Sequence, residues 1–343
     1  MKKSEVLVIG CGGCGNRQLE EFLSLDRRYT GIYMNTNMAE METLKHFDRD
    51  RRCFYIPNAD GTGKNRGLAE KYIKEEASKF MDMIAKFSGQ NHIIFLSSAN
   101  GGTGSMASIM LPRIIKAKFP AKKITLIATF PNIQESDIDF NNAIDFWNDM
   151  IKSRQNGYID SFMFIDNNKP FTEEDINRRA MKDLDSTFEI VQGKLDSIDV
   201  ERFHNSEGYK VILNLDNSID RAKRESVYYV PEKLDCDVMV GSLNAISIPN
   251  ISSKIDCYGF SKFHTKKEGN SIVALGGCEV PNECIELCQE VLRDISSRKK
   301  RRVIQEAVLV GAQKKEQKIE DNSLSRISSS DLEDMFADDN FWD

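Results

Sequence analysis

The chain has 343 residues, of which 29% are charged and 40% hydrophobic, and its formal net charge is −6. This length accommodates two domains with substantial cores, and the acidic balance argues against a surface built as a whole for nucleic acid. Eight cysteines are scattered along it, and Cys11 and Cys14 have no second pair at zinc spacing. We therefore expect reduced thiols in a cytoplasmic protein and no metal-binding cysteine cluster. No apolar run approaches about 20 residues, so we expect neither a membrane span nor secretion.

The first predicted element is an apolar strand over residues 6–9, which runs into a glycine-rich turn over residues 10–16 and then a helix. A wholly apolar run of this length is typical of a central parallel strand. Strand, glycine turn and helix in this order are the general nucleotide-binding arrangement, which dinucleotide-binding oxidoreductases share. Cys14 is either a small residue filling the turn or a contact to the nucleotide.

Two asparagines, Asn35 and Asn37, follow the second predicted strand at residues 31–34. A dinucleotide-binding enzyme prefers an acid here to bind the ribose. The asparagines therefore favour a different kind of nucleotide site, although asparagine-rich turns also occur for purely structural reasons.

Two further glycine loops follow, one at residues 58–67 and one at residues 100–105, the latter between a predicted strand at 93–96 and a predicted helix at 109–115. Glycines allow positive φ angles and close approach of a ligand, and the start of a helix favours a phosphate. No Gly-Lys-Ser/Thr ends the second loop, so it is not a Walker loop. Lys64 and Arg66 add positive charge to the first. The candidate contacts are Gly61, Thr62, Gly63, Gly101, Gly102, Thr103, Gly104 and Ser105.

The next predicted strand, residues 124–131, ends at a proline, and Glu135 lies four residues beyond it. Another strand at 161–165 is followed by Asn167, whose amide can both donate and accept hydrogen bonds to a purine edge. Thr172 is a plausible N-cap, and acids fill the first turn after it, so we predict a long helix to about residue 198.

The second half of the sequence carries less recognisable chemistry. Strand-like runs between residues 235 and 280 predict a smaller domain, and a helix with one apolar face begins near residue 281. That helix contains a basic run at 298–302, which is either a solvated face or a contact to an acidic partner. Beyond it the polar tail should be disordered in isolation. Its last residues, 331–343, interleave acids with large apolar side chains and resemble a partner-docking segment.

The order of these loops resembles the tubulin/FtsZ family, and residues 100–105 resemble its Gly-Gly-Gly-Thr-Gly-Ser/Thr signature. Three positions depart from the pattern: Asn100 stands at the first glycine, Met106 at the glycine that usually follows the signature, and Asp139 where an arginine is usual. The resemblance implies an α/β fold with a parallel-sheet GTPase domain (1–170), a central helix (171–205), a second domain (206–295) and a C-terminal helix with a tail (296–343). It also implies bound GTP or GDP with Mg²⁺. The nucleotide contacts carried over are Gly12, Gly13, Cys14, Asn16, Asn35, Asn37, the loop residues given above, Glu135 at the ribose, and Asn167 and Asp185 at the guanine.

The same resemblance implies that acids from one subunit complete the site of the next. In the family, a loop below the central helix carries Asn-x-Asp and a further acid, which polarise the attacking water. We assign these roles to Asn214, Asp216 and Asp220, with Asn205 and Glu207 as the rival placement. A polar turn after a strand at 211–213 would explain the first set equally well.

The resemblance therefore predicts a GTPase that assembles head to tail into filaments. The basic run and tail favour the plasmid- and phage-encoded branch of the family, whose filaments move DNA, with a DNA-binding adaptor as the expected partner of 298–302 and 331–343. A cell-division ring GTPase and a dinucleotide-dependent oxidoreductase are the alternatives.

Overall fold

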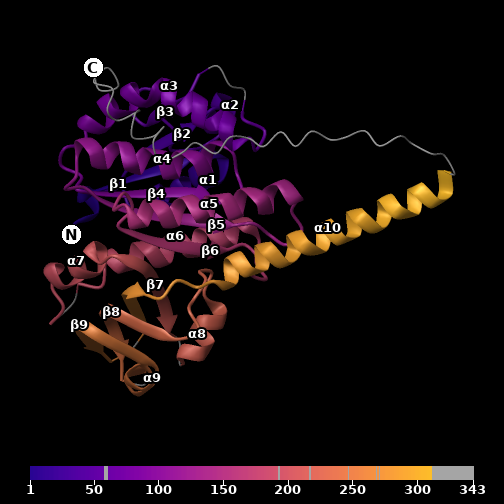
Figure 1. Cartoon of the computed structure of the whole chain (residues 1–343). Helices are drawn as coiled ribbons and strands as arrows, with labels where there is room; N and C mark the ends of the chain where they lie inside the picture. The colour runs from indigo at the N-terminus through magenta and orange to yellow at the C-terminus, as the bar shows by residue number, and fades with distance from the viewer. Residues whose placement is uncertain are drawn as a thin grey trace.

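The computed structural model describes residues 1–57, 61–191, 194–215, 218–245, 247–267, 269 and 271–310, and of residues 250, 252 and 300–310 it describes the backbone alone. One continuous sheet of ten strands crosses this part of the chain, in the order β3-β2-β1-β4-β5-β6-β7-β10-β8-β9 (Figure 1). The strands are β1 Val6–Cys11, β2 Thr30–Asn35, β3 Cys53–Tyr55, β4 His92–Ser98, β5 Lys123–Phe130, β6 Ser161–Asp166, β7 Gly208–Leu215, β8 Leu234–Asn244, β9 Ile255–Lys266 and β10 Ser271–Cys278.

The strands from β3 to β7 are all parallel, while β10 is antiparallel to both β7 and β8. Parallel strands need helical crossovers that cover both faces of the sheet, and this burial explains the uninterrupted apolar sequence of β1. Every residue of β1 is buried. The predicted fold class, a mixed α/β fold with a mostly parallel sheet, is confirmed.

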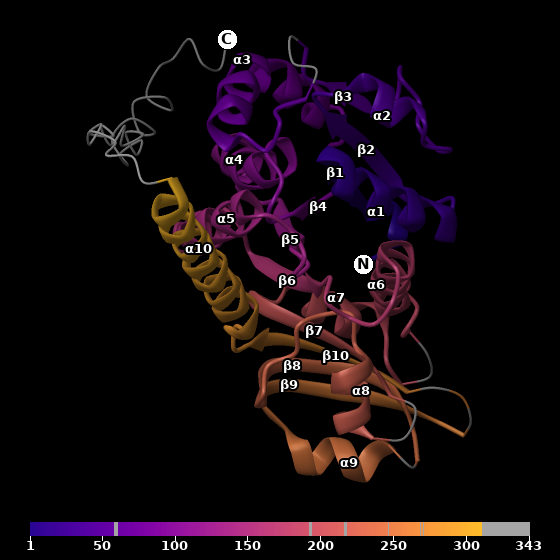
Figure 2. The ribbon, with the colours of Figure 1, turned by 90° about the vertical axis from the view of Figure 1, so that its right-hand side faces the viewer.

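Helices cover the parallel half of the sheet on both sides (Figure 2), with α3, α4 and α5 over one face and α1 and α6 over the other. The helices are α1 Gly12–Leu25, α2 Met38–Glu42, α3 Arg66–Ala85, α4 Thr103–Lys118, α5 Asp137–Gln155, α6 Glu173–Phe188, α7 Ser197–Asn205, α8 Ile219–Glu225, α9 Ser247–Lys254 and α10 Glu283–Val310. A short 3-10 turn, Lys3–Glu5, precedes β1.

The segment predicted as one central helix is two helices, α6 and α7. Asp196 restarts the chain as the N-cap of α7, because its carboxylate accepts hydrogen bonds from the backbone N–H groups of Ile198 and Asp199. The Asp199 carboxylate in turn accepts from the backbone N–H of Asp196 at 2.9 Å. This reciprocal capping box is the local signal that outweighs the helical periodicity.

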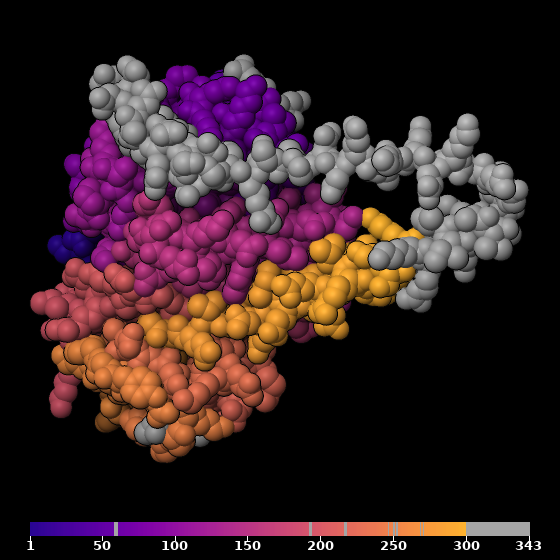
Figure 3. Space-filling view, viewed as in Figure 1, coloured from indigo at the N-terminus to yellow at the C-terminus, as the bar shows by residue number. Residues whose placement is uncertain are grey.

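The C-terminal helix forms as predicted, over Glu283–Val310, and it crosses the expected domain boundary at residues 295 and 296. Its first part packs along α5, and its second part extends away from the body (Figure 1). In the space-filling view, α10 forms a ridge across the surface between the two ends of the sheet (Figure 3). The predicted tail at 331–343 lies outside the described residues.

Candidate functional site

A cleft of about 180 Å³ opens at the carboxyl ends of β1, β2 and β4. This edge of an open parallel sheet is where such folds bind ligands. All three predicted glycine loops and the asparagine turn after β2 contribute to its wall. The lining residues are Gly12, Gly13, Asn35, Thr36, Asn37, Glu40, Gly61, Thr62, Ser98, Gly101, Gly102, Thr103 and Gly104.

Two of the glycines are required because the loops after β1 and β4 touch through their backbones. Gly12 has a φ of +68°, and a Cβ on Gly104 would lie 2.4 Å from the carbonyl oxygen of Cys11. Any larger residue at Gly104 would separate the loops. Since α1 and α4 both begin here, their free N–H groups and positive dipole ends converge on the cleft. This arrangement favours a phosphate group.

Three threonine hydroxyls from three separate loops meet at the start of α4. Thr103 Oγ1 lies 3.0 Å from Thr36 Oγ1 and 3.2 Å from Thr62 Oγ1. The predicted contact Ser105 is directed elsewhere, because its hydroxyl donates to the carbonyl of Gly101 in its own loop. The threonines therefore offer hydroxyls to a ligand, while Ser105 stabilises the loop.

Asn16 also has an internal partner. Its amide donates to the carbonyl of Met34 and accepts from the N–H of Met34, both at 3.2 Å, which fixes the end of β2 against α1. Cys14 lies in the first turn of α1, and burial raises the pKa of its thiol. Neither residue is among those lining the cleft, and Gly63, with open space around its Cα, is not among them either.

Glu40, which the sequence reasoning missed, projects into the cleft from α2. A Cβ on Gly13 would lie 2.1 Å from one carboxylate oxygen of Glu40. The other oxygen accepts a hydrogen bond from the amide of Asn35 at 2.8 Å, and Asn37 caps α2 by accepting from the N–H of Glu40. An acid at a site suited to phosphate must either move aside when phosphate binds or share a cation with it.

Asn100 and Asp139, which both depart from the family pattern, are joined by a hydrogen bond. The Asn100 amide donates to Glu135 at 2.6 Å and to Asp139 at 3.0 Å. Asp139 is 1% exposed and also pairs with Lys64. Burial alone would raise the pKa of Asp139, but Lys64 and Ser136 outweigh it and hold the pKa below its usual value. Burial and the neighbouring Asp139 raise the pKa of Glu135.

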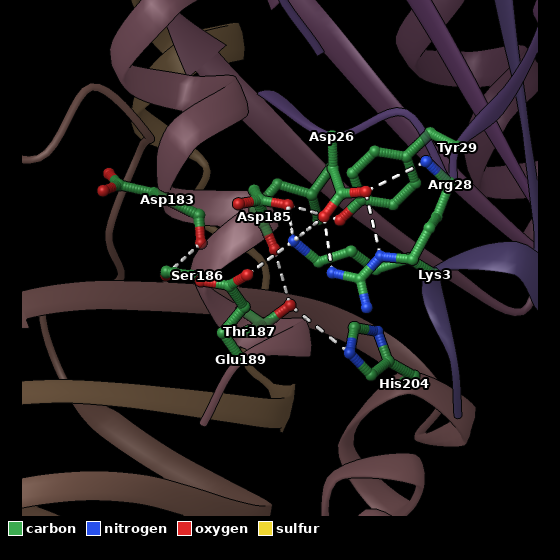
Figure 4. A network of polar contacts seen from close by, with 11 residues as sticks. Lys3, Asp26, Arg28, Tyr29, Asp183, Asp185, Ser186, Thr187, Glu189 and His204 are labelled. Carbon is green, nitrogen blue, oxygen red and sulfur yellow. Dashed lines mark hydrogen bonds and ion pairs between the residues drawn. The ribbon is translucent and has the colours of Figure 1, made fainter. Parts of the chain in front are cut away.

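Asp185 does not lie at the cleft, which corrects its assignment to the guanine contact. It binds Lys3 at 2.7 Å and Tyr29 at 2.5 Å, at the opposite edge of the sheet, before β1 begins (Figure 4). Helix α6 starts near the cleft edge and runs back along the sheet, so Asp185 lies roughly 18 Å further along its axis than Glu173. Asp183, on the same helix, forms a hydrogen bond with Asn214, and desolvation of the Asp183 carboxyl raises its pKa to about 7.

Asn177, one turn into α6, lies closer to the cleft edge of the sheet than Asp185 does. Gln18 of α1 donates to Asn177 Oδ1 at 3.1 Å and to Thr129 Oγ1 at 2.6 Å. The side-chain amide oxygen of Gln18, Oε1, is buried without a partner among the described residues. A polar residue on the buried face of α6 was the available sequence signal. Asn167 lies at the end of β6, where its carbonyl accepts from Asn132 at 2.8 Å.

The predicted catalytic set at 214–220 does not fit the head-to-tail arrangement that the resemblance implies. Strand β7 is parallel to β6, so Asn214 lies toward the same edge of the sheet as the cleft. Asp220 is exposed and pairs with Lys254, and Asp216 lies outside the described residues. A subunit that follows head to tail would face the other edge.

Acids at that other edge lie at the start of α7. The carbonyl of Ser197 accepts a hydrogen bond from the Met1 ammonium at 3.2 Å. Because Met1 precedes β1, this contact places the start of α7 at the edge where β1 begins. Asp196 is exposed, and Asp199 is buried against Lys262 of β9 at 2.6 Å. The rival pair lies at the end of α7 and just beyond it. Asn205 and Glu207 are both exposed, and Glu207 binds Arg154 and Lys123.

Comparisons with known proteins agree with this geometry. The family model described as "Tubulin/FtsZ family, GTPase domain" matches residues 5–172. The tubulin-like protein TubZ of the Clostridium botulinum C phage is 25% identical over 307 residues, covering 85% of this chain and 84% of that protein. The structure of tail-truncated TubZ from Clostridium botulinum phage c-st has a TM-score of 0.79 at 23% identity, covering 86% and 99% of the two chains.

A second similar structure is a GTPγS-form protofilament of TubZ from Bacillus thuringiensis serovar israelensis. Its TM-score is 0.68 at 13% identity, and the match covers 87% of this chain and 94% of that one. None of the described helices is long and apolar enough to cross a membrane. Residues 5–172 are thus a tubulin/FtsZ-family GTPase domain, and the likeness to phage TubZ extends along most of the chain.

Proposed function

We propose that this chain binds GTP in the cleft, assembles head to tail and hydrolyses GTP at the interface between subunits. The observation that carries the proposal is the placement of complementary groups at opposite edges of one sheet. The N-termini of α1 and α4 converge on one edge, and the acids at the start of α7 lie at the other.

The acids we propose for hydrolysis are Asp196 and Asp199, in place of the set at 214–220. Asp196 is exposed at the tip of α7, so a neighbouring subunit can reach it. Asp199 is held in place by Lys262 and by the backbone of Asp196. Phosphoryl transfer to water depends mainly on positioning and on the charge around the phosphate, which suits one exposed and one fixed carboxylate.

The remaining contacts divide by the nucleotide group that they would meet. The backbone N–H groups of residues 12–13 and 101–104, with the three threonine hydroxyls, would hold the phosphates. Asn177 and Asn167 would bind the guanine edge. Mg²⁺ carried with the nucleotide would be held by the phosphates and by Glu40, and would offset the charge that they share.

We further propose that the filaments move or position plasmid or phage DNA in a bacterial cytoplasm. The likeness to a phage tubulin-like protein supports this role. The basic run at 298–302 would engage a DNA-bound adaptor, and the segment at 331–343 would do so as well.

Complementation between two inactive variants tests the proposal. Gly104→Ala should distort the cleft by forcing apart the loops after β1 and β4, and Asp199→Ala should remove an acid. Each variant alone should therefore hydrolyse GTP at least about 100-fold more slowly than the parent chain. A mixture should recover activity, because acids of the first variant meet the intact cleft of the second. Circular dichroism checks the folding of each variant, and Asp220→Ala serves as the control that keeps full activity.

Sedimentation completes the test. The parent chain should pellet with GTP or a slowly hydrolysed analogue and stay in the supernatant with GDP. Hydrolysis by a protein that never pellets, or a mixture no more active than its parts, would contradict hydrolysis at the interface.

A further inference from the structure

Lys64, a residue outside the contacts assigned so far, is placed between the phosphate end of the cleft and a buried acid. We propose that Lys64 distinguishes nucleoside triphosphate from diphosphate by exchanging Asp139 for the terminal phosphate. The inference rests on the nucleotide site proposed above. It gives Asn100 and Asp139, which both depart from the family pattern, a shared part in this exchange.

The loop that carries Lys64 is in direct contact with the start of α4. Thr62, two residues earlier, lines the cleft and lies 3.2 Å from Thr103 through their hydroxyls. A Cβ on Gly102 would lie 3.1 Å from the carbonyl carbon of Lys64. The Lys64 side chain is 47% exposed, so its ammonium is free to move between the network and the cleft.

The backbone at Lys64 is held in an unfavourable conformation. Its φ of +66° is the one positive value at a non-glycine residue within the described ranges. The amide of Asn142 donates to the Lys64 carbonyl at 2.8 Å and to the Asn100 carbonyl at 3.0 Å, which clamps the two loops together. Such strain persists where surrounding contacts impose it, and it is common at ligand clamps.

Asp139 can release Lys64 without being left as a bare buried charge. The carboxylate oxygen that accepts from Lys64 also accepts from the Asn100 amide at 3.0 Å. Its other oxygen accepts from the hydroxyl and the N–H of Ser136 at 2.6 and 3.1 Å. A buried acid that keeps these hydrogen bonds avoids most of the penalty of losing its cation. Asn100, where the family has glycine, therefore makes the exchange feasible.

The first test removes the lysine charge and keeps the backbone conformation. Lys64→Asn is suitable because asparagine tolerates positive φ. We expect the dissociation constant of a GTPγS complex to rise on the order of tenfold, and that of GDP to change less than about twofold, by fluorescence titration. Lys64→Arg, which keeps the charge, should restore most of the preference for triphosphate.

The second test asks whether Asp139 competes through Lys64. Asp139→Asn should tighten GTPγS binding in the parent chain and leave it unchanged in the Lys64→Asn chain, since a double-mutant cycle isolates their coupling. Asp149→Asn is the matched control, because Asp149 joins the same loop to α5 through Arg66 at 2.7 Å. It should leave the ratio of the two affinities unchanged.

The inference is overturned if Lys64→Asn weakens GTPγS and GDP equally, or if Asp149→Asn reproduces the effect of Asp139→Asn. These outcomes leave the proposed function standing. If the parent chain binds neither nucleotide, the proposed function itself fails and the inference fails with it.

Discussion

Among the ion pairs described above, the replacement of Lys3 should lower the free energy of unfolding the most. Its side chain is 4% exposed, and its ammonium lies 3.2 Å from Asp26, 2.7 Å from Asp185 and 2.8 Å from Glu189 (Figure 4). These acids come from the end of α1 and the end of α6. Burial would lower the pKa of Lys3, but the hydrogen bonds that its ammonium donates to the three carboxylates outweigh burial and raise the pKa.

Lys3→Met should lower the free energy of unfolding by about 2–4 kcal/mol. Breaking a buried ion pair by removing one partner costs roughly 3–5 kcal/mol, and we reduce that figure because Glu189 is 59% exposed and can turn to water. At roughly 2–4 °C per kcal/mol, the range for chains of about 200 residues, the melting temperature should fall by about 4–16 °C. Urea unfolding followed by circular dichroism measures the loss, and Lys2→Met, at an exposed neighbour, is the matched control.

The pH dependence of this loss has a definite sign. Arg28 and Lys3 hold the pKa of Asp26 below its usual value, so its stabilisation is present above an unfolded pKa of about 3.9 and is lost as pH falls further. The difference between Lys3→Met and the parent should therefore shrink below about pH 4. A loss under about 0.5 kcal/mol at pH 7, or one that grows in acid, would refute the reasoning.

Three further changes have clear expected outcomes. Gly104→Ala should weaken GDP binding at least about 100-fold in a calorimetric titration, because the added Cβ would meet the carbonyl of Cys11 at 2.4 Å. Asn177→Ala should weaken GDP binding about tenfold and reduce discrimination against inosine diphosphate, whereas a change in neither would remove Asn177 from the base site. Burial lowers the pKa of Lys210 to about 7, so Lys210→Met should stabilise the chain by about 2–4 kcal/mol at pH 6. That gain should decline as pH rises from 7 to 10, and a constant gain would indicate a packing effect instead.

The glycine loops that form the cleft could be predicted from the sequence, whereas the residue on α6 proposed to contact the base could not. Glycine loops after apolar strands are local patterns, and parallel strands bring their carboxyl ends to one edge, so the loops at Gly12 and Gly104 could be placed together without a structure. Asp185 could not be placed, because its position depends on where α6 starts and in which direction it runs along the sheet.

The catalytic assignment was misplaced for a related reason. The direction of β7 follows from its pairing with β6, which is a long-range contact that residues 211–220 do not encode locally. The capping box of Asp196 and Asp199 was visible in the sequence and would have divided the predicted central helix. Glu40 was missed although its partners Asn35 and Asn37 are close in sequence. Lys64 was noted as a charge on its loop, but its contact with Asp139 was out of reach because it joins segments 75 residues apart.

The join between the two halves of the sheet is short. Strands β6 and β7 pair only at Ser161 with Gly208 and at Phe162 with Tyr209, after which they separate. The opening is filled by a crossing segment, in which the Tyr229 N–H donates to the carbonyl of Phe164 at 2.9 Å and the Asp166 N–H donates to that of Val227 at 2.8 Å. Tilting one half against the other would thus disturb few ladder bonds. The sheet carries a ready-made pivot whose flanking backbone groups are already satisfied, so the two halves of one subunit could tilt with little change in backbone hydrogen bonding.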